Sequence, residues 1–176
     1  MQRLRLFAAA LLLLVPATAF AAADHADLFN GAEINWRDSK TGIYEASKTG
    51  KPVIMVLHAT WCSACKRYRA VFKDPGIVAA SKDFIMILVD ADKEKEINGA
   101  FSPDGTYVPR TLFIDSEGNV SEKFTGGDPK YPHTIDADNP AELLTLMIRA
   151  KASNFGRLPQ DAPPTGDSDA AADQKT

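Results

Sequence analysis

Cys62 and Cys65 are the only cysteines among 176 residues, and two residues, Ser63 and Ala64, separate them. Thiols at this spacing can alternate between a dithiol and a disulfide without a large backbone movement. The pair therefore favours electron exchange with cysteines of other proteins, in which a thiolate attacks a disulfide. We expect Cys62 to be the attacking nucleophile and Cys65 to resolve the mixed disulfide that forms on Cys62.

A buried strand followed by a helix is predicted to position this pair. Val53 to His58 is a near-continuous apolar run, typical of a strand covered on both faces, and residues 62–73 have helical spacing. Cys62 then stands in the first helical turn, where unpaired N–H groups and the helix dipole favour the thiolate. We expect Trp61 to shield Cys62 partly from water and to contact substrate.

Three other uses of a close cysteine pair fit the sequence less well. A zinc site needs two further ligands, and the only histidines are His25, His58 and His133. Covalent haem attachment needs a histidine directly after the second cysteine, where Lys66 stands. A purely structural disulfide would close so short a loop that it stabilises little, although an inactive redox fold would have the same pattern. No metal is therefore expected.

The chain ends are expected to lie outside the folded domain. Residues 1–23 have a basic start, a ten-residue apolar run and small residues, which is typical of a cleaved signal peptide. We expect one domain over residues 24–156 and a disordered tail over residues 157–176, where large apolar side chains are almost absent. An exported protein meets oxidising conditions, so a periplasm is favoured, with an endoplasmic reticulum lumen or secretion as alternatives.

Charge argues against nucleic acid as a partner, because the net charge is -3 and no basic stripe is present.

The remaining pattern predicts an α/β fold with a central mixed sheet flanked by helices. The expected strands cover residues 84–89, 111–114 and 120–124, and a loop or short helix is expected within 90–104. A helix is expected over 39–49, with Ile43, Ala46 and possibly Tyr44 inward, and a shorter helical piece over 75–82. Asn139 opens a last helix, whose apolar stripe is Leu143, Leu144, Met147 and Ile148.

Two segments resemble the thioredoxin superfamily. Residues 51–56 leading into Trp61-Cys62-Ser63-Ala64-Cys65-Lys66 look like the strand and redox motif of a thioredoxin fold. Tyr107-Val108-Pro109-Arg110, followed by residues 111–115, looks like the segment that carries the cis-proline of that fold. The resemblance covers roughly residues 36–151, and it implies a single domain with the thioredoxin fold.

Two branches of this superfamily are close. Residues 101–105, and Leu57-His58 before the cysteines, resemble the anterior-gradient and endoplasmic-reticulum thioredoxin-domain proteins. Residues 71–75 followed by Val78 resemble the periplasmic C-terminal domain of the membrane thiol:disulfide interchange protein. Both branches belong to disulfide exchange.

The resemblance implies that the Val108–Pro109 peptide bond is cis and lies beside Cys62. Pro109 has no N–H, and Val108 would then offer its backbone to a substrate strand. Cis bonds occur almost only before proline, so the expectation is physically reasonable. The alternative is a proline that simply starts a strand.

The sequence departs from ordinary thioredoxin around the pair. Ser63-Ala64 replaces the Gly-Pro dipeptide, and Val56 occupies the position of a buried acid that assists proton transfer at the second cysteine. His58 lies two residues after Val56, hence on the same strand face. It could tune Cys62 or relay a proton, or it could be a histidine satisfied at a strand end.

Together these observations predict a thiol:disulfide oxidoreductase of an exported compartment that acts on protein thiols and disulfides. It needs no bound cofactor, because the Cys62–Cys65 pair itself takes up and gives off two electrons as it changes between disulfide and dithiol. A membrane electron donor or acceptor would be its partner, while the mature chain itself would not enter the membrane. The alternative is a chaperone-like or substrate-binding module on a thioredoxin scaffold with little redox turnover. The direction of electron flow stays open.

Overall fold

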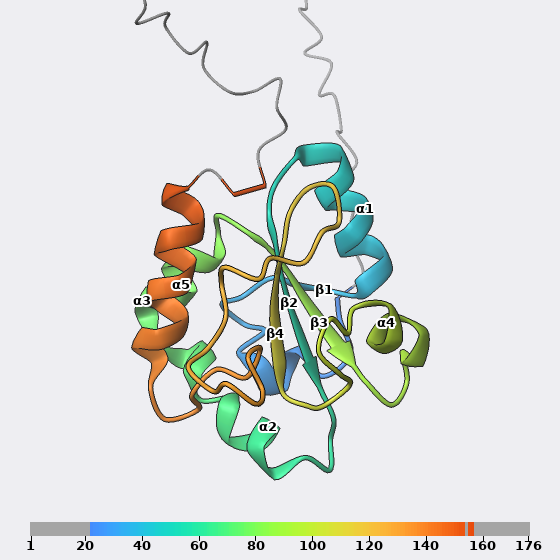
Figure 1. Cartoon of the computed structure of the whole chain (residues 1–176), viewed down its shortest axis with the longest axis vertical. Helices are drawn as coiled ribbons and strands as arrows, with labels where there is room; N and C mark the ends of the chain where they lie inside the picture. The colour runs from blue at the N-terminus through green and yellow to red at the C-terminus, as the bar shows by residue number, and fades with distance from the viewer. Residues whose placement is uncertain (1–21, 154, 157–176) are drawn as a thin grey trace, which may run out of the picture.

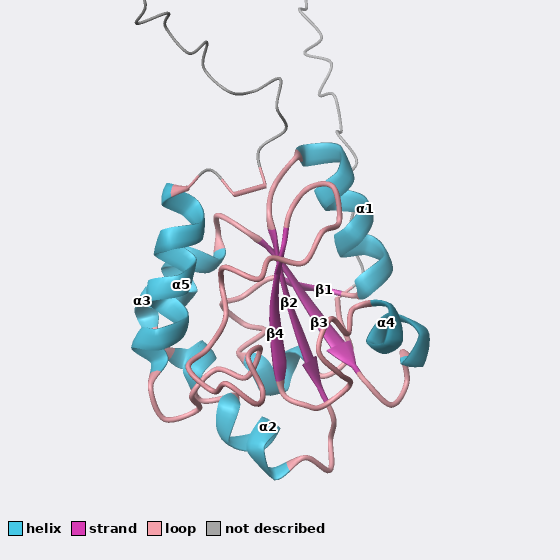
Figure 2. Cartoon of the chain, viewed as in Figure 1, coloured by secondary structure: helices cyan, strands magenta, loops and turns pink. Residues whose placement is uncertain are grey.

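A four-stranded mixed sheet forms the centre of the molecule (Figure 2). The computed structural model describes residues 22–153 and 155–156, so most of the expected signal peptide and the whole expected tail lie outside the described residues. The strands are β1 (Trp36–Arg37), β2 (Val53–His58), β3 (Ile85–Asp90) and β4 (Arg110–Ile114), in the order β1-β3-β2-β4. β1 and β2 run parallel to β3, and β4 runs antiparallel to β2.

Helices cover both faces of this sheet (Figure 1). α1 (Ser39–Thr49) and α4 (Lys95–Ala100) lie on one face, and α2 (Ser63–Tyr68), α3 (Pro75–Ser81) and α5 (Pro140–Ala152) lie on the other. Short 3-10 turns cover Ala26–Phe29 and Val71–Lys73. The predicted α/β architecture with a mixed sheet flanked by helices is confirmed.

Strand β2 is the centre of the core because it pairs with a strand on each side and all six of its residues are buried. Side chains alternate between faces along a strand. Ile54 and Val56 therefore join the large apolar cluster under α2, α3 and α5, while Met55 and Leu57 join the cluster under α1. Burial of each such side chain contributes about 1.5–3 kcal/mol. A strand buried in this way holds its last residues, and the turn after them, firmly in place.

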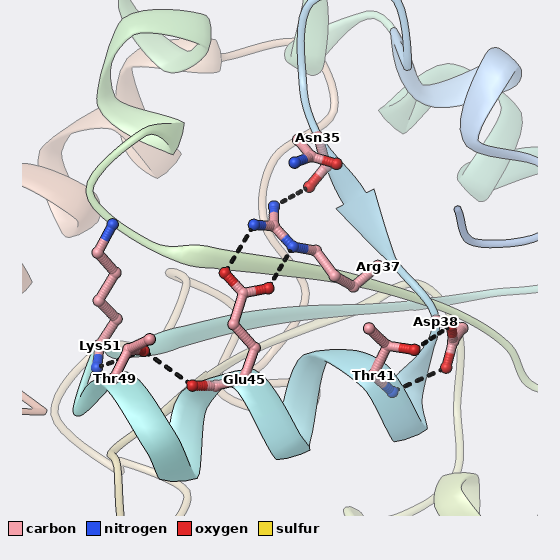
Figure 3. A network of polar contacts seen from close by, with 7 residues as sticks. All are labelled: Asn35, Arg37, Asp38, Thr41, Glu45, Thr49 and Lys51. Carbon is pink, nitrogen blue, oxygen red and sulfur yellow. Dashed lines mark hydrogen bonds and ion pairs between the residues drawn. The ribbon is translucent and has the colours of Figure 1, made fainter. Parts of the chain in front are cut away.

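Helix α1 begins and ends where local chemistry dictates (Figure 3). The Asp38 carboxylate accepts a hydrogen bond from the Thr41 backbone N–H at 2.9 Å, which caps the first turn. Gly50 ends the helix with φ of 66°, a left-handed conformation that favours glycine. Arg37 of β1 forms a two-pronged ion pair with Glu45, at 2.7 and 2.8 Å, and so ties α1 to the edge of the sheet.

The inward face of α1 differs from the expected one. Ile43 is 37% exposed and Tyr44 is 61% exposed, whereas Gly42 and Ala46 are buried. A Cβ atom on Gly42 would lie 2.4 Å from Cγ1 of Ile87 in β3. The helix therefore packs through its smallest residues. The expectation that Ala46 faces inward is confirmed, whereas the same expectation for Ile43 and Tyr44 is wrong because close approach to β3 selects the side of Gly42.

Three further expectations are corrected. The helix over 62–73 ends at Tyr68 and continues only as a 3-10 turn. The strand over 120–124 reduces to one bridge between Ile114 and Val120. The buried residues of α5 are Leu143, Leu146, Met147 and Ala150, while Ile148 is 57% exposed. In each case long-range packing, which periodicity does not report, sets the boundary or the buried face.

None of the helices within the described ranges is long and apolar enough to cross a membrane.

Substituting Gly42 by alanine is expected to lower the free energy of unfolding by about 1–3 kcal/mol, because the added methyl group collides with Ile87. Gly99 in α4 is a matched control, since nothing lies within 4 Å of a Cβ atom built on it. Gly99→Ala should raise the free energy of unfolding by up to about 1 kcal/mol through helix propensity. Urea denaturation of both variants checks this, and equal effects would contradict the close packing of α1.

Candidate active site

The two cysteines lie where β2 ends and α2 begins. Cys62 is the N-cap residue of α2, and Cys65 lies in its first turn. They are joined as a disulfide with Cα atoms 5.2 Å apart. Cys62 is 5% exposed and Cys65 is fully buried. Both cysteines are thus buried, and Cys62 is the one that keeps a small exposed area.

The sulfur of Cys62 takes the place of a helix-capping oxygen. The backbone N–H of Cys65 donates to Sγ of Cys62 at 3.1 Å. The first N–H groups of a helix lack partners within it, and an anion satisfies them better than a neutral group. In the reduced protein this hydrogen bond favours the thiolate of Cys62. Cys65 is buried among apolar neighbours, and within the described residues no hydrogen bond is donated to its sulfur.

The segment before β4 lies against the cysteine pair. The Val108–Pro109 peptide bond is cis, as the resemblance implies. The carbonyl oxygen of Val108 lies 3.6 Å from Sγ of Cys62, and its side chain packs on the cluster of Ala59, Cys62 and Cys65. Two segments separated by 46 residues are thus brought together at one sulfur atom.

Trp61 presents its ring at the surface beside the pair. It is 69% exposed, and its indole N–H donates to the Asp92 carboxylate at 2.8 Å. Asp92 lies in the turn after β3, so a hydrogen bond from a separate segment fixes the ring's orientation. An exposed aromatic face in a fixed position is suited to contact with another chain.

His58 is fully buried at the end of β2, and neither ring nitrogen has a hydrogen-bond partner within the described residues. Its ring centroid lies 4.9 Å from that of Phe29 and 5.4 Å from that of His25. Burial lowers the pKa of His58 to about 4; Asp90 opposes this shift, while His25 and Arg69 add to it. His58 is therefore a neutral imidazole at neutral pH.

Asp90 is the carboxylate next to this histidine. It pairs with His58 across β2 and β3, is 4% exposed, and lies with Oδ2 at 3.5 Å from Nδ1 of His25. Its other oxygen, Oδ1, accepts from the backbone N–H of Asp92 at 3.0 Å. The segment before β1 thus covers the ends of both central strands. The ring contacts of His58, with Phe29 and His25, lead to this segment and not to the cysteines.

A pair of hydroxyl groups lies beside Val56, where thioredoxin has its acid. Thr111 of β4 pairs with Val56, and its hydroxyl is 2.7 Å from the Tyr68 hydroxyl. Burial raises the pKa of Tyr68, so this phenol stays neutral. Tyr68 follows Cys65 by three residues on α2, hence on the same helix face. The polar groups beside Val56 in this part of the core are therefore neutral hydroxyls.

No group of three or more His, Cys, Asp or Glu side chains that could hold a metal ion occurs in residues 22–153 and 155–156. Disulfide exchange needs none, because the two electrons move when one sulfur–sulfur bond breaks and another forms.

Sequence reasoning missed two residues near the pair. Asp92 belonged to an acidic stretch that suggested only a solvated loop, yet it orients Trp61. Arg110 follows the cis-proline and is fully buried. A charged residue directly before the apolar run 111–114 was a signal, since a strand start in the core seldom tolerates an unbonded guanidinium.

Comparison with known proteins agrees with this geometry. The family model described as Thioredoxin-like matches residues 35–116. Anterior gradient protein 3 of Xenopus tropicalis is 32% identical over 124 residues, which cover 68% of this chain and 73% of the relative.

Solved structures show the same fold. A thioredoxin from Thermus thermophilus matches with a TM-score of 0.54 and 18% identity, over 69% of this chain and 89% of that one. The disulphide isomerase from Xylella fastidiosa Temecula1 matches with a TM-score of 0.51 and 19% identity, over 77% and 99%.

Replacing His58 by phenylalanine is expected to reduce the loss in the free energy of unfolding that occurs as the pH falls. The pKa is about 4 in the folded protein and about 6.5 unfolded, so only the unfolded chain binds this proton between those values. Stability should therefore fall by about 2–3 kcal/mol between pH 6.5 and 4 in the parent, relative to His58→Phe.

Denaturant titrations of both proteins across pH 4 to 7.5 measure this difference. Above pH 6.5 the difference should be constant, because the imidazole is neutral in both states. Parallel profiles over the whole range would show that His58 titrates normally when folded.

Proposed function

Since this chain belongs to the thioredoxin-like family, we propose that it is a thiol:disulfide oxidoreductase acting on protein cysteines through its Cys-Ser-Ala-Cys motif. The observation that carries the proposal is the asymmetry of the pair. Cys62 caps α2, accepts the Cys65 N–H at 3.1 Å and keeps an exposure of 5%, whereas Cys65 is fully buried.

The roles follow from this asymmetry. In the reducing direction the Cys62 thiolate attacks a partner disulfide, forms a mixed disulfide and releases one partner thiolate. Cys65 then loses its proton and attacks Sγ of Cys62. This step closes the Cys62–Cys65 disulfide and releases the second partner thiolate, so two electrons have moved to the partner. In the oxidising direction the same steps run backwards.

The partner segment is proposed to dock as an extended strand along Val108. The Val108 carbonyl lies 3.6 Å from the attacking sulfur, so a strand placed beside this backbone would bring its cysteine to Cys62. Pro109 has no N–H group to compete for that strand's carbonyl oxygens. Trp61, exposed on the other side of the pair, would contact the same segment.

Proton transfer at Cys65 is proposed to use neutral groups. Val56 cannot accept a proton, and the nearby Tyr68 and Thr111 hydroxyls are hydrogen-bonded to each other. We propose that His58 influences the reactivity of the cysteine pair indirectly. Its neutral ring adds no charge to the core at the end of β2.

The compartment is proposed from the sequence alone. Residues 1–23 have the pattern of a cleaved signal peptide, which favours an exported domain over residues 24–156. An oxidising periplasm suits a redox-active cysteine pair, and a reductase there would need electrons returned by a membrane protein. An endoplasmic reticulum lumen or secretion are the alternatives.

Cys65→Ser is expected to trap mixed disulfides between Cys62 and partner proteins, because the second attack is lost. Non-reducing gels of cells that express the full chain, followed by mass spectrometry, identify the trapped partners. Cys62→Ser is the matched control and should trap markedly fewer. An empty trap, with Cys65→Ser protein folded and exported, would sink the proposal.

The rate at which a thiol reagent alkylates reduced Cys62 is expected to rise with pH through an inflection well below the ordinary thiol pKa of about 8.5. The backbone N–H at the start of α2 lowers the pKa of this thiol, because it stabilises the thiolate. A stopped-flow titration with a thiol reagent on the Cys65→Ser variant measures it. A chaperone-like module on the same scaffold would leave the inflection at an ordinary thiol value.

A further inference from the structure

Arg110 is a fully buried cation directly after the cis-proline. Its Nη1 donates to the carbonyl oxygen of Gly105, and its Nη2 donates to the side-chain oxygen of Asn98 and, at 3.2 Å, to that residue's carbonyl oxygen. Nε has no partner among the described residues, and no ion pair to a carboxylate is found there. Burying a guanidinium costs free energy, so the hydrogen bonds to Gly105 and Asn98 are what keep Arg110 in place.

A second set of bonds holds the same loop from the other side. The Tyr107 hydroxyl donates to the Asp104 carboxylate and accepts from the backbone N–H of His133 at 3.0 Å. The Thr134 hydroxyl donates to the carbonyl oxygen of Pro109 at 3.1 Å. The guanidinium lies 5.8 Å from the centroid of the Tyr107 ring, so the two sets meet. The backbone that contains Val108 is thus anchored before and after it.

We propose that Arg110 is a positioning residue that fixes the end of α4 and the loop after it, residues 98–105, and thereby holds the backbone of Val108 where a partner's cysteine-bearing strand docks beside Cys62. This inference rests on the proposed function. Its physical basis is the geometry of the guanidinium, whose planar fork sets direction as well as distance. The Val108 carbonyl lies only 3.6 Å from Sγ of Cys62, so a small shift of this loop changes the approach of the partner sulfur.

Two oxidised probes separate docking from sulfur chemistry. One is a peptide disulfide long enough to lie along Val108, and the other is 4,4′-dithiodipyridine, a small neutral disulfide that needs no strand contact. Arg110→Met in the full chain should lose about tenfold in kcat/KM with the peptide, mainly through KM. Its rate with 4,4′-dithiodipyridine should stay within about twofold of the parent rate.

Arg37→Met is the matched control, because Arg37 is a largely buried arginine with bonds to Glu45 and Asn35 on the β1 edge of the sheet (Figure 3). It should leave both rates at the parent values. Asn98→Ala removes one acceptor of Arg110 and keeps the cation, and it should give a smaller loss of about threefold with the peptide only. This variant decides the question if Arg110→Met does not fold.

An equal loss with both probes would overturn the inference, since Arg110 would then act on the sulfur or on the fold as a whole. Unchanged peptide kinetics in a folded variant would overturn it as well. A parent protein that reacts with 4,4′-dithiodipyridine but never with a peptide disulfide would instead overturn the proposed function, and the docking role with it.

Discussion

The pairing of β2 with a strand on each side is the constraint on which the site depends. β2 is buried along its whole length between β3 and β4, so its last residue and the turn that follows have little freedom. The parallel pairing with β3 brings Asp90 beside His58, and the antiparallel pairing with β4 brings Val108 to the cysteines. One buried strand therefore places the sulfur atoms, the Val108 carbonyl beside Cys62 and the neighbouring His58 and Asp90.

The short helix α2 converts this placement into chemical asymmetry. Because Cys62 is the N-cap residue, its sulfur meets a backbone N–H, while Cys65 is turned into apolar surroundings one turn further on. Two identical side chains so acquire different surroundings from backbone geometry. The helix ends at Tyr68, whose hydroxyl is hydrogen-bonded to that of Thr111 in the core.

Two buried polar groups at the strand ends behave differently. At the end of β2, the neutral His58 lies against aromatic rings and contributes no charge at neutral pH. At the start of β4, Arg110 is held by the carbonyl oxygens of Asn98 in α4 and Gly105 in the loop after it. Both arrangements are costly in isolation and persist because neighbouring segments hold them. Because the buried guanidinium needs these hydrogen bonds, the segment that supplies their acceptors is held in one position in the folded protein.

The sequence by itself determined the close cysteine pair, the α/β class and the buried strand over 53–58, because these depend on local spacing and apolar runs, and its resemblance to the thioredoxin superfamily gave the position of the cis-proline. It could not show that Gly42 forms the inward face of α1, that residues 120–124 barely pair, or that Arg110 and Asp92 bond to the segments beside Cys62. Only the tertiary structure decided these features. Each depends on contacts between residues far apart in the chain, whose distances are set by how the strands pair and how closely the helices approach them.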